Sequence, residues 1–189
     1  MKNSLVVLIL VFIFNISLLN LSVSQEQFNF NVTEIEINEK GNKFKGLKRG
    51  TISTNNGVYI DADTFEYDKV TNILIAYGNI IIKDKTNNLT IISEDITFLR
   101  NEDKIFTKTR SKAFSNDIYI DADSLEYNKK LNTLNAKGNV KVEEKVKKLI
   151  VNSDEITYYK DSEIFISKYR SEAIGEGLNI KADEFEYNN

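Results

Sequence analysis

The sequence predicts an all-β protein, a twisted antiparallel β-jelly-roll assembled from half-repeats of about 30 residues. Apolar residues alternate with polar ones, which is the period of a β-strand with one buried face. One motif recurs at intervals of 60 residues. Short clusters of turn-forming residues separate the alternating runs, and such short connections favour antiparallel neighbours because a parallel crossover needs roughly a dozen residues or more.

The first segment of the chain has the features of a secretory signal. A basic start leads into ten apolar residues, Leu5 to Phe14, and a small-x-small triplet ends at Ser24, directly before Gln25. We therefore expect residues 1–24 to be a cleaved signal peptide and residues 25–189 to be the repeat domain. The alternative is an uncleaved anchor, whose apolar stretch would be at the short end of the ~17 to 25 residues that a spanning helix needs.

The repeat is visible without gaps. Residues Tyr59 to Tyr67 (YIDADTFEY) recur as Tyr119 to Tyr127 (YIDADSLEY) and again as Asn179 to Tyr187 (NIKADEFEY). In the same register, Leu74 to Ile80 (LIAYGNI) matches Leu134 to Val140 (LNAKGNV). The repeating unit therefore extends well beyond one signature, and a missed repeat would misassign the whole fold.

The elements follow in chain order from this pattern. A degraded copy begins at Thr33 to Ile37, and each full unit divides in two, because Ser93 to Phe98 and Ser153 to Tyr158 share one pattern. Strands are expected between the turns that punctuate the chain, which are 68–72, 84–88, 100–103, 128–132, 160–163 and 175–177.

Two irregularities predict corners in these strands. The step between inward residues is three instead of two from Ala62 to Phe65, and it recurs from Ser93 to Ile96, Ala122 to Leu125, Ser153 to Ile156 and Ala182 to Phe185. Such a slip moves the side chains to the other face unless the strand bulges or bends there. Gly78 and Gly138 occupy apolar-phase positions, which marks a kink or the close approach of another group. We expect a narrow apolar interior with regular corners.

Composition excludes several classes of function. The chain has no Cys, His, Trp or Pro, so disulfides, thiolate or imidazole catalysis and His/Cys zinc sites are not available. A formal charge of −3 gives no basic field for nucleic acid. We expect no enzyme activity, no cofactor and no metal.

Three local clusters resemble functional sites but favour bland interpretations. Asp61, Asp63 and Glu66 could suggest a calcium or glycosidase cluster, yet they are expected to form a solvated, Lys-paired face. Residues 41–46 have the glycine spacing of a phosphate loop without its lysine, so no nucleotide is implied. A basic cluster could meet lipid phosphate or an acidic neighbour, although a solvated loop is favoured; its residues are Lys43, Lys45, Lys48 and Arg49.

One strand carries apolar residues on both faces. Its outward phase holds Ile73, Ile75, Tyr77 and Ile81, where the next unit has polar residues. We expect the segment 32–37 to cover this face, and a docking patch is the alternative.

The repeat motifs resemble a known transport family. Ile-x-Ala-Asp-x-x-x-Tyr-(Asp/Asn)-Lys followed by Asn-x-Leu-x-Ala-x-Gly-Asn-(Ile/Val) is similar to the OstA/LptA family, which includes LptA-like bridge proteins and the N-terminal domain of LptD. The match lies at Ile60 to Ile82, Ile120 to Val142 and Ile180 to Asn188, and weaker half-units extend it over most of Thr33 to Asn189.

The resemblance implies a function, a place and partners. It implies a β-jelly-roll in the periplasm of a Gram-negative bacterium that shelters the acyl chains of lipopolysaccharide on their way to the outer membrane. Its edges would stack by β-strand augmentation on other jelly-roll Lpt components, or on a second copy. By this analogy the edge residues are Ile35, Ile37, Phe185 and Tyr187.

The same analogy, together with the strand phase, selects candidate groove residues. They are Ile60, Phe65, Tyr67, Leu74, Ala76, Ile80, Ile82, Ile91, Ile96, Phe98, Ile120, Leu125, Tyr127, Leu134, Ala136, Val140 and Val142. A filled sandwich would show the same alternation, so each residue taken singly is also explained as core. The alternatives to a lipid bridge are an N-terminal fragment of an LptD-like protein, an anchored LptC-like form and a β-repeat scaffold or adhesion protein.

Overall fold

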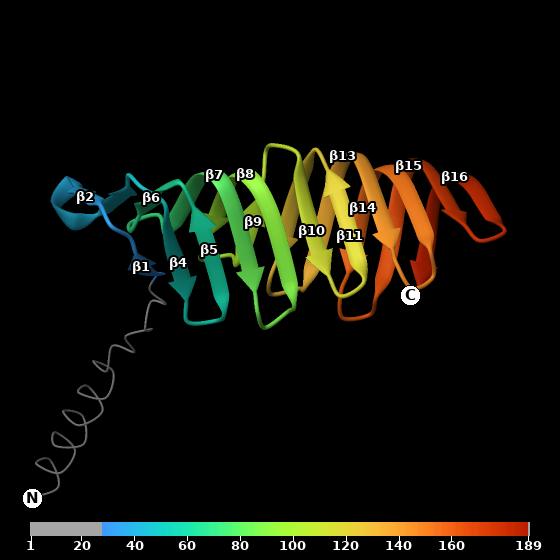
Figure 1. Cartoon of the computed structure of the whole chain (residues 1–189), viewed down its shortest axis with the longest axis horizontal. Coiled ribbons are helices and arrows are strands. Elements are labelled where there is room, and N and C mark those ends of the chain that lie inside the picture. The colour runs from blue at the N-terminus through green and yellow to red at the C-terminus, as the bar shows by residue number, and fades with distance from the viewer. Residues whose placement is uncertain (1–27, 189) are drawn as a thin grey trace, which may run out of the picture.

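The computed structural model describes residues 28–188, which form one sheet of sixteen strands folded into two layers (Figure 1). Every pairing in this sheet is antiparallel. The all-β antiparallel prediction is therefore confirmed. The expected signal peptide and its cleavage site at Ser24 and Gln25 lie outside the described residues.

Short strands belong to a single layer. Layer one contains β1 (Phe28–Asn31), β4 (Gly50–Thr54), β5 (Val58–Ala62), β10 (Ser111–Ser115) and β11 (Ile118–Ala122). Layer two contains β2 (Ile35–Asn38), β3 (Lys43–Gly46), β6 (Thr64–Asp68), β9 (Lys104–Phe106) and β12 (Ser124–Asn128), and the 3-10 turn η1 (Glu39–Gly41) joins β2 to β3.

Long strands pass through both layers and connect them. They are β7 (Ile73–Asp84), β8 (Leu89–Leu99), β13 (Thr133–Glu144), β14 (Leu149–Tyr159), β15 (Ile164–Gly175) and β16 (Leu178–Asn188). The first half of β7 pairs with β6 in layer two, and its second half pairs with β5 in layer one. The strands stack along the long axis of the molecule, from β2 at one end to β16 at the other (Figure 1).

The expected corners are present where the long strands change layer. The pairing of β7 with β8 shifts between Tyr77 and Ile80, and that of β13 with β14 shifts between Lys137 and Val140. The three-residue step at Ala62 is the break between β5 and β6. The irregular spacing in the sequence thus predicted the bend that folds the sheet over.

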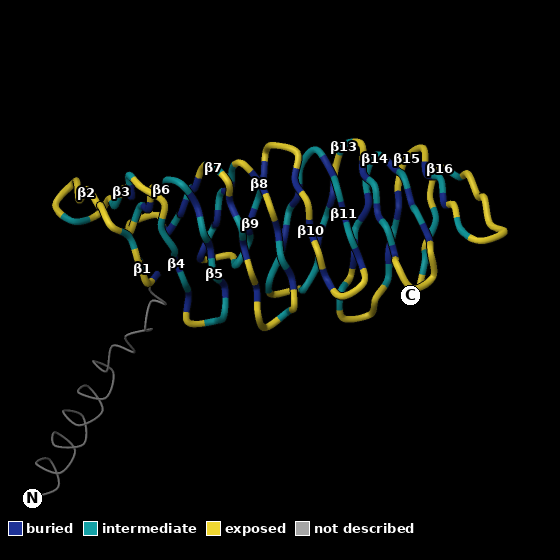
Figure 2. The backbone as a smooth tube through the Cα atoms, in the orientation of Figure 1, coloured by how far each residue is buried: buried dark blue, intermediate teal, exposed yellow. Residues whose placement is uncertain are grey.

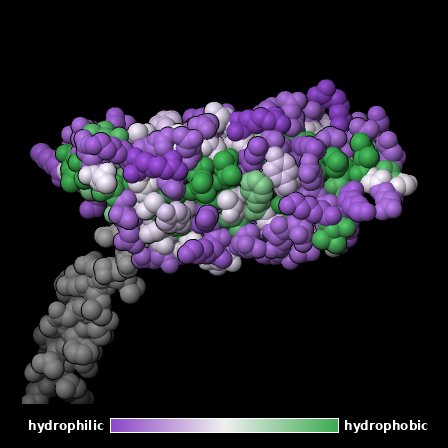
Figure 3. Space-filling view, viewed as in Figure 1, coloured by the Kyte–Doolittle hydropathy of each residue, from purple (hydrophilic) through white to green (hydrophobic). Residues whose placement is uncertain are grey.

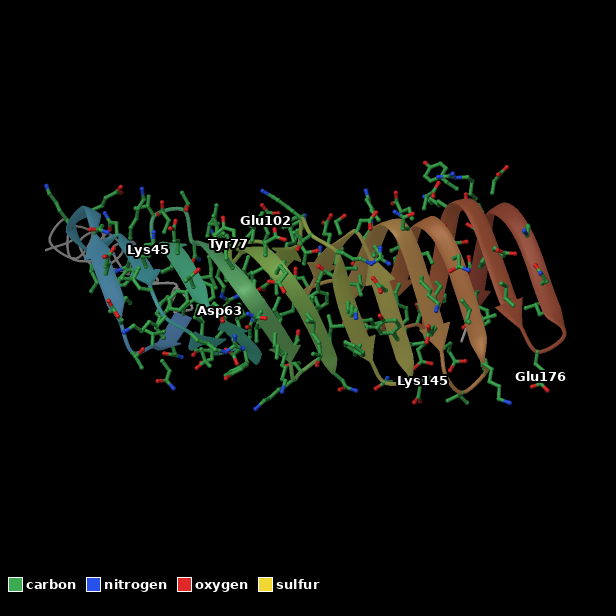
Figure 4. All side chains as sticks on the ribbon, turned by 45° about the horizontal axis from the view of Figure 1, so that its top comes forward. Lys45, Asp63, Tyr77, Glu102, Lys145 and Glu176 are labelled. Atoms are coloured by element: carbon green, nitrogen blue, oxygen red, sulfur yellow. The ribbon has the colours of Figure 1, made fainter. Side chains whose placement is uncertain are left out.

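The core fills the space between the layers. Side chains alternate between buried and exposed along each strand, so the inner faces form one apolar cluster that extends along the stack (Figure 2). The turns that join the strands lie at the rims, where Glu102, Lys145 and Glu176 mark three of them (Figure 4). Within residues 28–188, no helix is long and apolar enough to span a membrane.

The outer face of β7 is not covered by the N-terminal segment as expected. Strand β2 pairs with β3 and so continues layer two beyond β6 instead of lying over that face. Ile73, Ile75 and Ile81 are half-buried among their neighbours, and Tyr77 is exposed. The outer surface is mostly hydrophilic, with separate hydrophobic patches (Figure 3).

Candidate functional site: the apolar interior and its boundaries

All seventeen predicted groove residues point into the interior. Their exposed fractions range from 0% to 8%, and Tyr67 is the most exposed. Layer one contributes Ile60, Ile80, Ile82, Ile91, Ile120, Val140 and Val142. Layer two contributes Phe65, Tyr67, Leu74, Ala76, Ile96, Phe98, Leu125, Tyr127, Leu134 and Ala136. The structure therefore brings the whole predicted set together on two facing layers.

The interior also contains residues that the prediction omitted. Ile156 and Tyr158 are buried, as are Ile52, Val58, Ala62, Leu89, Ile105, Ala113, Ile118, Ala122, Leu149, Val151, Phe165 and Ala173. The same two-residue period would have found most of them. Tyr158 and Phe165 stack with ring centroids 4.2 Å apart, and burial raises the pKa of the Tyr158 hydroxyl to about 12, with Glu163 adding to the shift.

The interior of the described structure is packed by its own side chains. Phe65, Leu74, Ala76, Ile80, Ile96 and Phe98 have no exposed surface, so no water-sized space adjoins them. A guest molecule would have to separate the layers or displace these side chains.

The layers meet along two different boundaries. At the corners they are joined by continuous backbone. The opposite boundary, which we call the mouth, is the line where the strand ends of layer one face those of layer two. Among residues 28–188, the hydrogen bonds that cross the mouth are made by side chains.

One polar cluster closes the mouth, and we call it the clasp. Asp84, at the end of β7 in layer one, accepts hydrogen bonds from the Tyr127 hydroxyl (2.8 Å) and the Lys129 ammonium (2.7 Å) of layer two. Asn87 donates from its amide to both the Asp84 carboxylate (2.9 Å) and the Tyr127 hydroxyl (2.7 Å). Asp84 and Lys129 are both buried, with 1% and 10% of their side chains exposed.

The clasp changes the acidity of its members. Burial alone would raise the pKa of Asp84, but hydrogen bonds from Lys129 and Tyr127 outweigh it and hold that pKa below its ordinary value. Burial and the neighbouring Asp84 carboxylate raise the pKa of Tyr127. Asp84 is therefore an anion and Tyr127 a neutral donor at neutral pH, which keeps the clasp closed.

Two weaker links extend the mouth. Asn56 donates to Asp103 across it (3.3 Å), and Lys160 contacts Ser115. Further along, Glu144 occupies the position of Asp84 in the next repeat, but its carboxylate accepts from the backbone of Val146 and Lys147. A hollow of about 680 Å³ lies there, lined by residues that include Ile118, Glu144 and Tyr158. The second repeat therefore leaves the mouth partly open.

The N-terminal end of the interior is closed by aromatic rings. Phe28 contacts Tyr67 and Phe98 edge-on, with centroids 5.0 Å and 5.6 Å apart. Phe30 stacks on Phe44 and Phe65. Strand β1, which carries Phe28 and Phe30, thus caps this end.

The four predicted edge residues lie on edge strands. Ile35 and Ile37 belong to β2, which pairs only with β3, and are 39% and 58% exposed. Phe185 and Tyr187 belong to β16, which pairs only with β15 among residues 28–188, and both are half-buried.

The repeated motifs build the corners. Asp63 follows β5, its backbone N–H donates to the Gly78 carbonyl (3.1 Å), and its carboxylate accepts from the Asn79 amide (2.7 Å) and from Arg49 (2.6 Å). These two hydrogen bonds to the carboxylate lower the pKa of Asp63. Figure 4 labels Asp63 and Tyr77, which precedes the corner glycine.

The second repeat has the same corner. The Asp123 N–H donates to the Gly138 carbonyl (2.9 Å), and its carboxylate accepts from Asn139 (2.6 Å) and Arg110 (2.9 Å). Gly138 and Asn139 have φ values of 75° and 45°, in the left-handed region that glycine and asparagine tolerate best. The Ala-Asp and Gly-Asn signatures are thus two halves of one joint.

The acidic cluster is a paired surface, but its partners differ from the expected lysines. Arg49 binds both Asp61 and Asp63, and Lys45 binds Glu66. Within residues 28–188, no cluster of acidic side chains is arranged to hold a metal ion.

The basic cluster is likewise paired. Lys43 binds Glu39, Lys48 binds Glu34, and Lys45 and Arg49 bind the acids named above. The glycine-spaced segment 41–46 lies in the hairpin of β2 and β3, without a following helix. These ion pairs satisfy the cluster within the chain.

Comparisons with known proteins agree with this geometry. The sequence pattern of the family described as "LptA/(LptD N-terminal domain) LPS transport protein" matches residues 59–164, more than half of the chain. A search of curated protein sequences gave no match.

Among solved structures, the chain resembles LptH from Pseudomonas aeruginosa, described as the LptA-homologous periplasmic component of the lipopolysaccharide transport device. The TM-score is 0.54 at 11% identity, over 60% of this chain and 84% of LptH, which establishes a common fold. The corner signatures Asp63, Gly78, Asp123 and Gly138 all lie inside the matched region. The chain belongs to the LptA/LptD N-terminal-domain family of lipopolysaccharide transport proteins.

Proposed function

We propose that this protein shelters lipopolysaccharide acyl chains between its two layers as the lipid crosses the periplasm. The observation that carries the proposal is the single apolar cluster that runs along the stack, bounded on one side by a mouth that only side chains close. Family membership supports the lipid class. Partners of the same fold are proposed to stack on the edges at Ile35 and Ile37 and at Phe185 and Tyr187.

The energetics of an acyl chain explain the need for such an interior. At ~0.8 kcal/mol per methylene, ten buried methylenes are worth about 8 kcal/mol, so a multiply acylated lipid cannot cross water unsheltered. The side chains that now fill the interior provide equivalent contacts in the absence of lipid. Exchange of one filling for the other keeps the apolar surface covered throughout.

The mouth is the proposed route of entry. Separating the layers there breaks the clasp and the two weaker links but leaves the strand pairing of both layers intact. The corners would act as the hinge, because their backbone is continuous. Entry therefore costs side-chain hydrogen bonds instead of backbone ones.

Site-specific photocrosslinking tests the proposal. A photoreactive amino acid at Leu74 or Ala136, both fully buried, should give lipopolysaccharide adducts in cells, because acyl chains would replace their present neighbours. The matched controls are the outward-facing neighbours Ile75 and Asn135, which should give none. An LptA protein labelled in parallel checks the method. Adducts with the LptA protein but none at Leu74 or Ala136 would overturn the proposal and leave a β-repeat scaffold.

The family description covers both free LptA-like proteins and the N-terminal domain of LptD. Sequencing the reading frame beyond Asn189 distinguishes these two roles. A continuation into a long series of aromatic-belted strands would assign the chain to an LptD-like protein.

A further inference from the structure

The last strand carries half of a third corner. Asp183 in β16 stands 60 residues after Asp123 and 120 after Asp63, within the same Ala-Asp signature. Asp63 and Asp123 each bind a Gly-Asn pair on the next strand. Among residues 28–188, Asp183 has no hydrogen-bond or ion-pair partner, and it lies in a shallow hollow with Arg170 and Lys181.

Two further groups on this edge differ from their counterparts. Arg170 corresponds to Arg110, which binds the corner carboxylate, but Arg170 binds Asp154 through two hydrogen bonds of 2.8 Å. The Tyr187 hydroxyl is buried without a partner, whereas the Tyr67 hydroxyl donates to Asn72, directly before the next strand (2.9 Å). The carboxylate and the hydroxyl are both left for one missing strand.

Strand order shows which strand is missing. Strands β5 and β6, or β11 and β12, are followed in the sheet by a bent Gly-Asn strand, β7 or β13, and then by β8 or β14. Strands β1 and β2 pair as the two halves of β8 do, so the N-terminal edge is of the β8 type. A second copy placed end to end, in the same orientation, would bring a β8-type strand directly against β16.

Such direct stacking conflicts with the rest of the sheet. Because β5 and β8 both pair antiparallel with β7, they run in the same direction, and so would β16 and the β1 of the next copy. One intervening strand restores antiparallel pairing on both sides. The Gly-Asn pairs at 78–79 and 138–139 are used in the chain's own corners, and Gly41-Asn42 lies at the η1 turn.

We infer that the β16 edge binds a bent strand from outside these residues whose Gly-Asn corner pairs with Asp183. This inference names the partner chemistry for the edge stacking proposed above and rests on that proposal. The incoming asparagine would donate to the Asp183 carboxylate, and a residue just before the strand would accept from Tyr187. Lys181 stands where Asp121 faces Lys141, so the incoming strand should carry an acid or a neutral residue there.

A peptide based on β13 tests the inference. The probe is a fluorescent peptide of residues Asn132–Glu144 with Lys141→Glu, which removes the clash with Lys181, and its binding to the purified protein is followed by anisotropy. Replacing the peptide's Gly138 and Asn139 by alanine should weaken binding about tenfold or more, the size expected for a hydrogen bond to a carboxylate.

The protein variants complete a double-mutant cycle. Asp183→Ala should weaken binding of the Gly-Asn peptide to the level of the alanine peptide and make the two peptides equivalent. Glu176→Ala, at an exposed turn of the same hairpin, is the matched control and should change nothing. Equal binding of both peptides to the wild type would overturn the inference. So would end-to-end oligomers that form without peptide and that the peptide does not disrupt, because a second copy would then be the occupant.

Lipid crosslinking separates the two proposals. Adducts at Leu74 and Ala136 without peptide selectivity would reject the inference and keep the proposed function. Selective peptide binding without adducts would do the reverse.

Discussion

At the scale of single residues, the corners depend on glycine for two reasons. A Cβ atom at Gly138 would lie 2.6 Å from an Asp123 carboxylate oxygen, and the φ of 75° is unfavourable for any other L-residue. Gly175 has neither constraint, since the nearest atom to a Cβ there is 3.4 Å away. The chain thus provides a matched pair of strand glycines.

Gly138→Ala should lower the free energy of unfolding by about 2 kcal/mol, because it adds strain and displaces the corner carboxylate. Gly175→Ala should change it by less than about 0.5 kcal/mol. Urea unfolding followed by circular dichroism measures both. Equal effects of the two substitutions would show that the corner does not need glycine.

The clasp predicts a pH dependence of stability. The pKa of Asp84 is lowered in the folded protein, so this carboxylate stabilises the fold above its unfolded pKa of about 3.9. That contribution is lost as the pH falls through the lower, folded pKa. Asp84→Asn should therefore be less stable than wild type at pH 7, and the difference should shrink below pH ~4. Urea midpoints at pH 7 and pH 3 give the comparison, and a constant difference would refute this role.

Single residues also mark where sequence reasoning ends. The two-residue period correctly turned Tyr127 inward, but its hydroxyl binds Asp84, 43 residues earlier in the chain. Periodicity reports which face a side chain occupies and carries no information about which rim of the other layer it meets. For the same reason, Asp63 was correctly placed on a solvated face, but its arginine and asparagine partners were not predicted.

At the scale of elements, β1 closes the interior with two rings. Phe28 is buried against Tyr67 and Phe98, whereas Phe30 is only half-buried. The sequence alone did not predict this strand, because its four residues are too few to establish a period. Only the unpaired edge of β4 gives the segment a place to form.

Phe28→Ala should lower the free energy of unfolding by about 3 kcal/mol and expose the end of the interior. Phe30→Ala should cost less, because less of its surface is buried. Thermal melts report the stability, and a dye that binds exposed apolar surface reports the opening. If Phe28→Ala left both readouts unchanged, β1 would not be the cap.

The long strands show what a regular pattern can predict. All six turns read from the sequence separate strands in the structure, and the three-residue steps coincide with breaks or register shifts. The sequence did not show that β7 continues through its corner while β5 and β6 separate at theirs. That difference depends on the left-handed backbone of Gly78 and Asn79.

At the scale of the whole molecule, the repeat sets the permitted lengths. Removing residues 79–138 joins Gly78 to Asn139 and rebuilds one complete corner from two. The shortened protein should fold cooperatively, with a smaller urea m-value because less surface is exposed on unfolding. Removing residues 79–108 takes out half a unit and places Thr109 after Gly78, so it should not give a cooperative transition.

Each corner takes its carboxylate from one strand and its glycine-asparagine pair from the following strand. A tandem duplication of 60 residues therefore copies both halves of the joint at once, wherever in the unit its breakpoints fall. Genes of this kind can lengthen or shorten by recombination without inventing a new contact. The joint that bends a strand thus also fixes the smallest change in length that descendants can inherit.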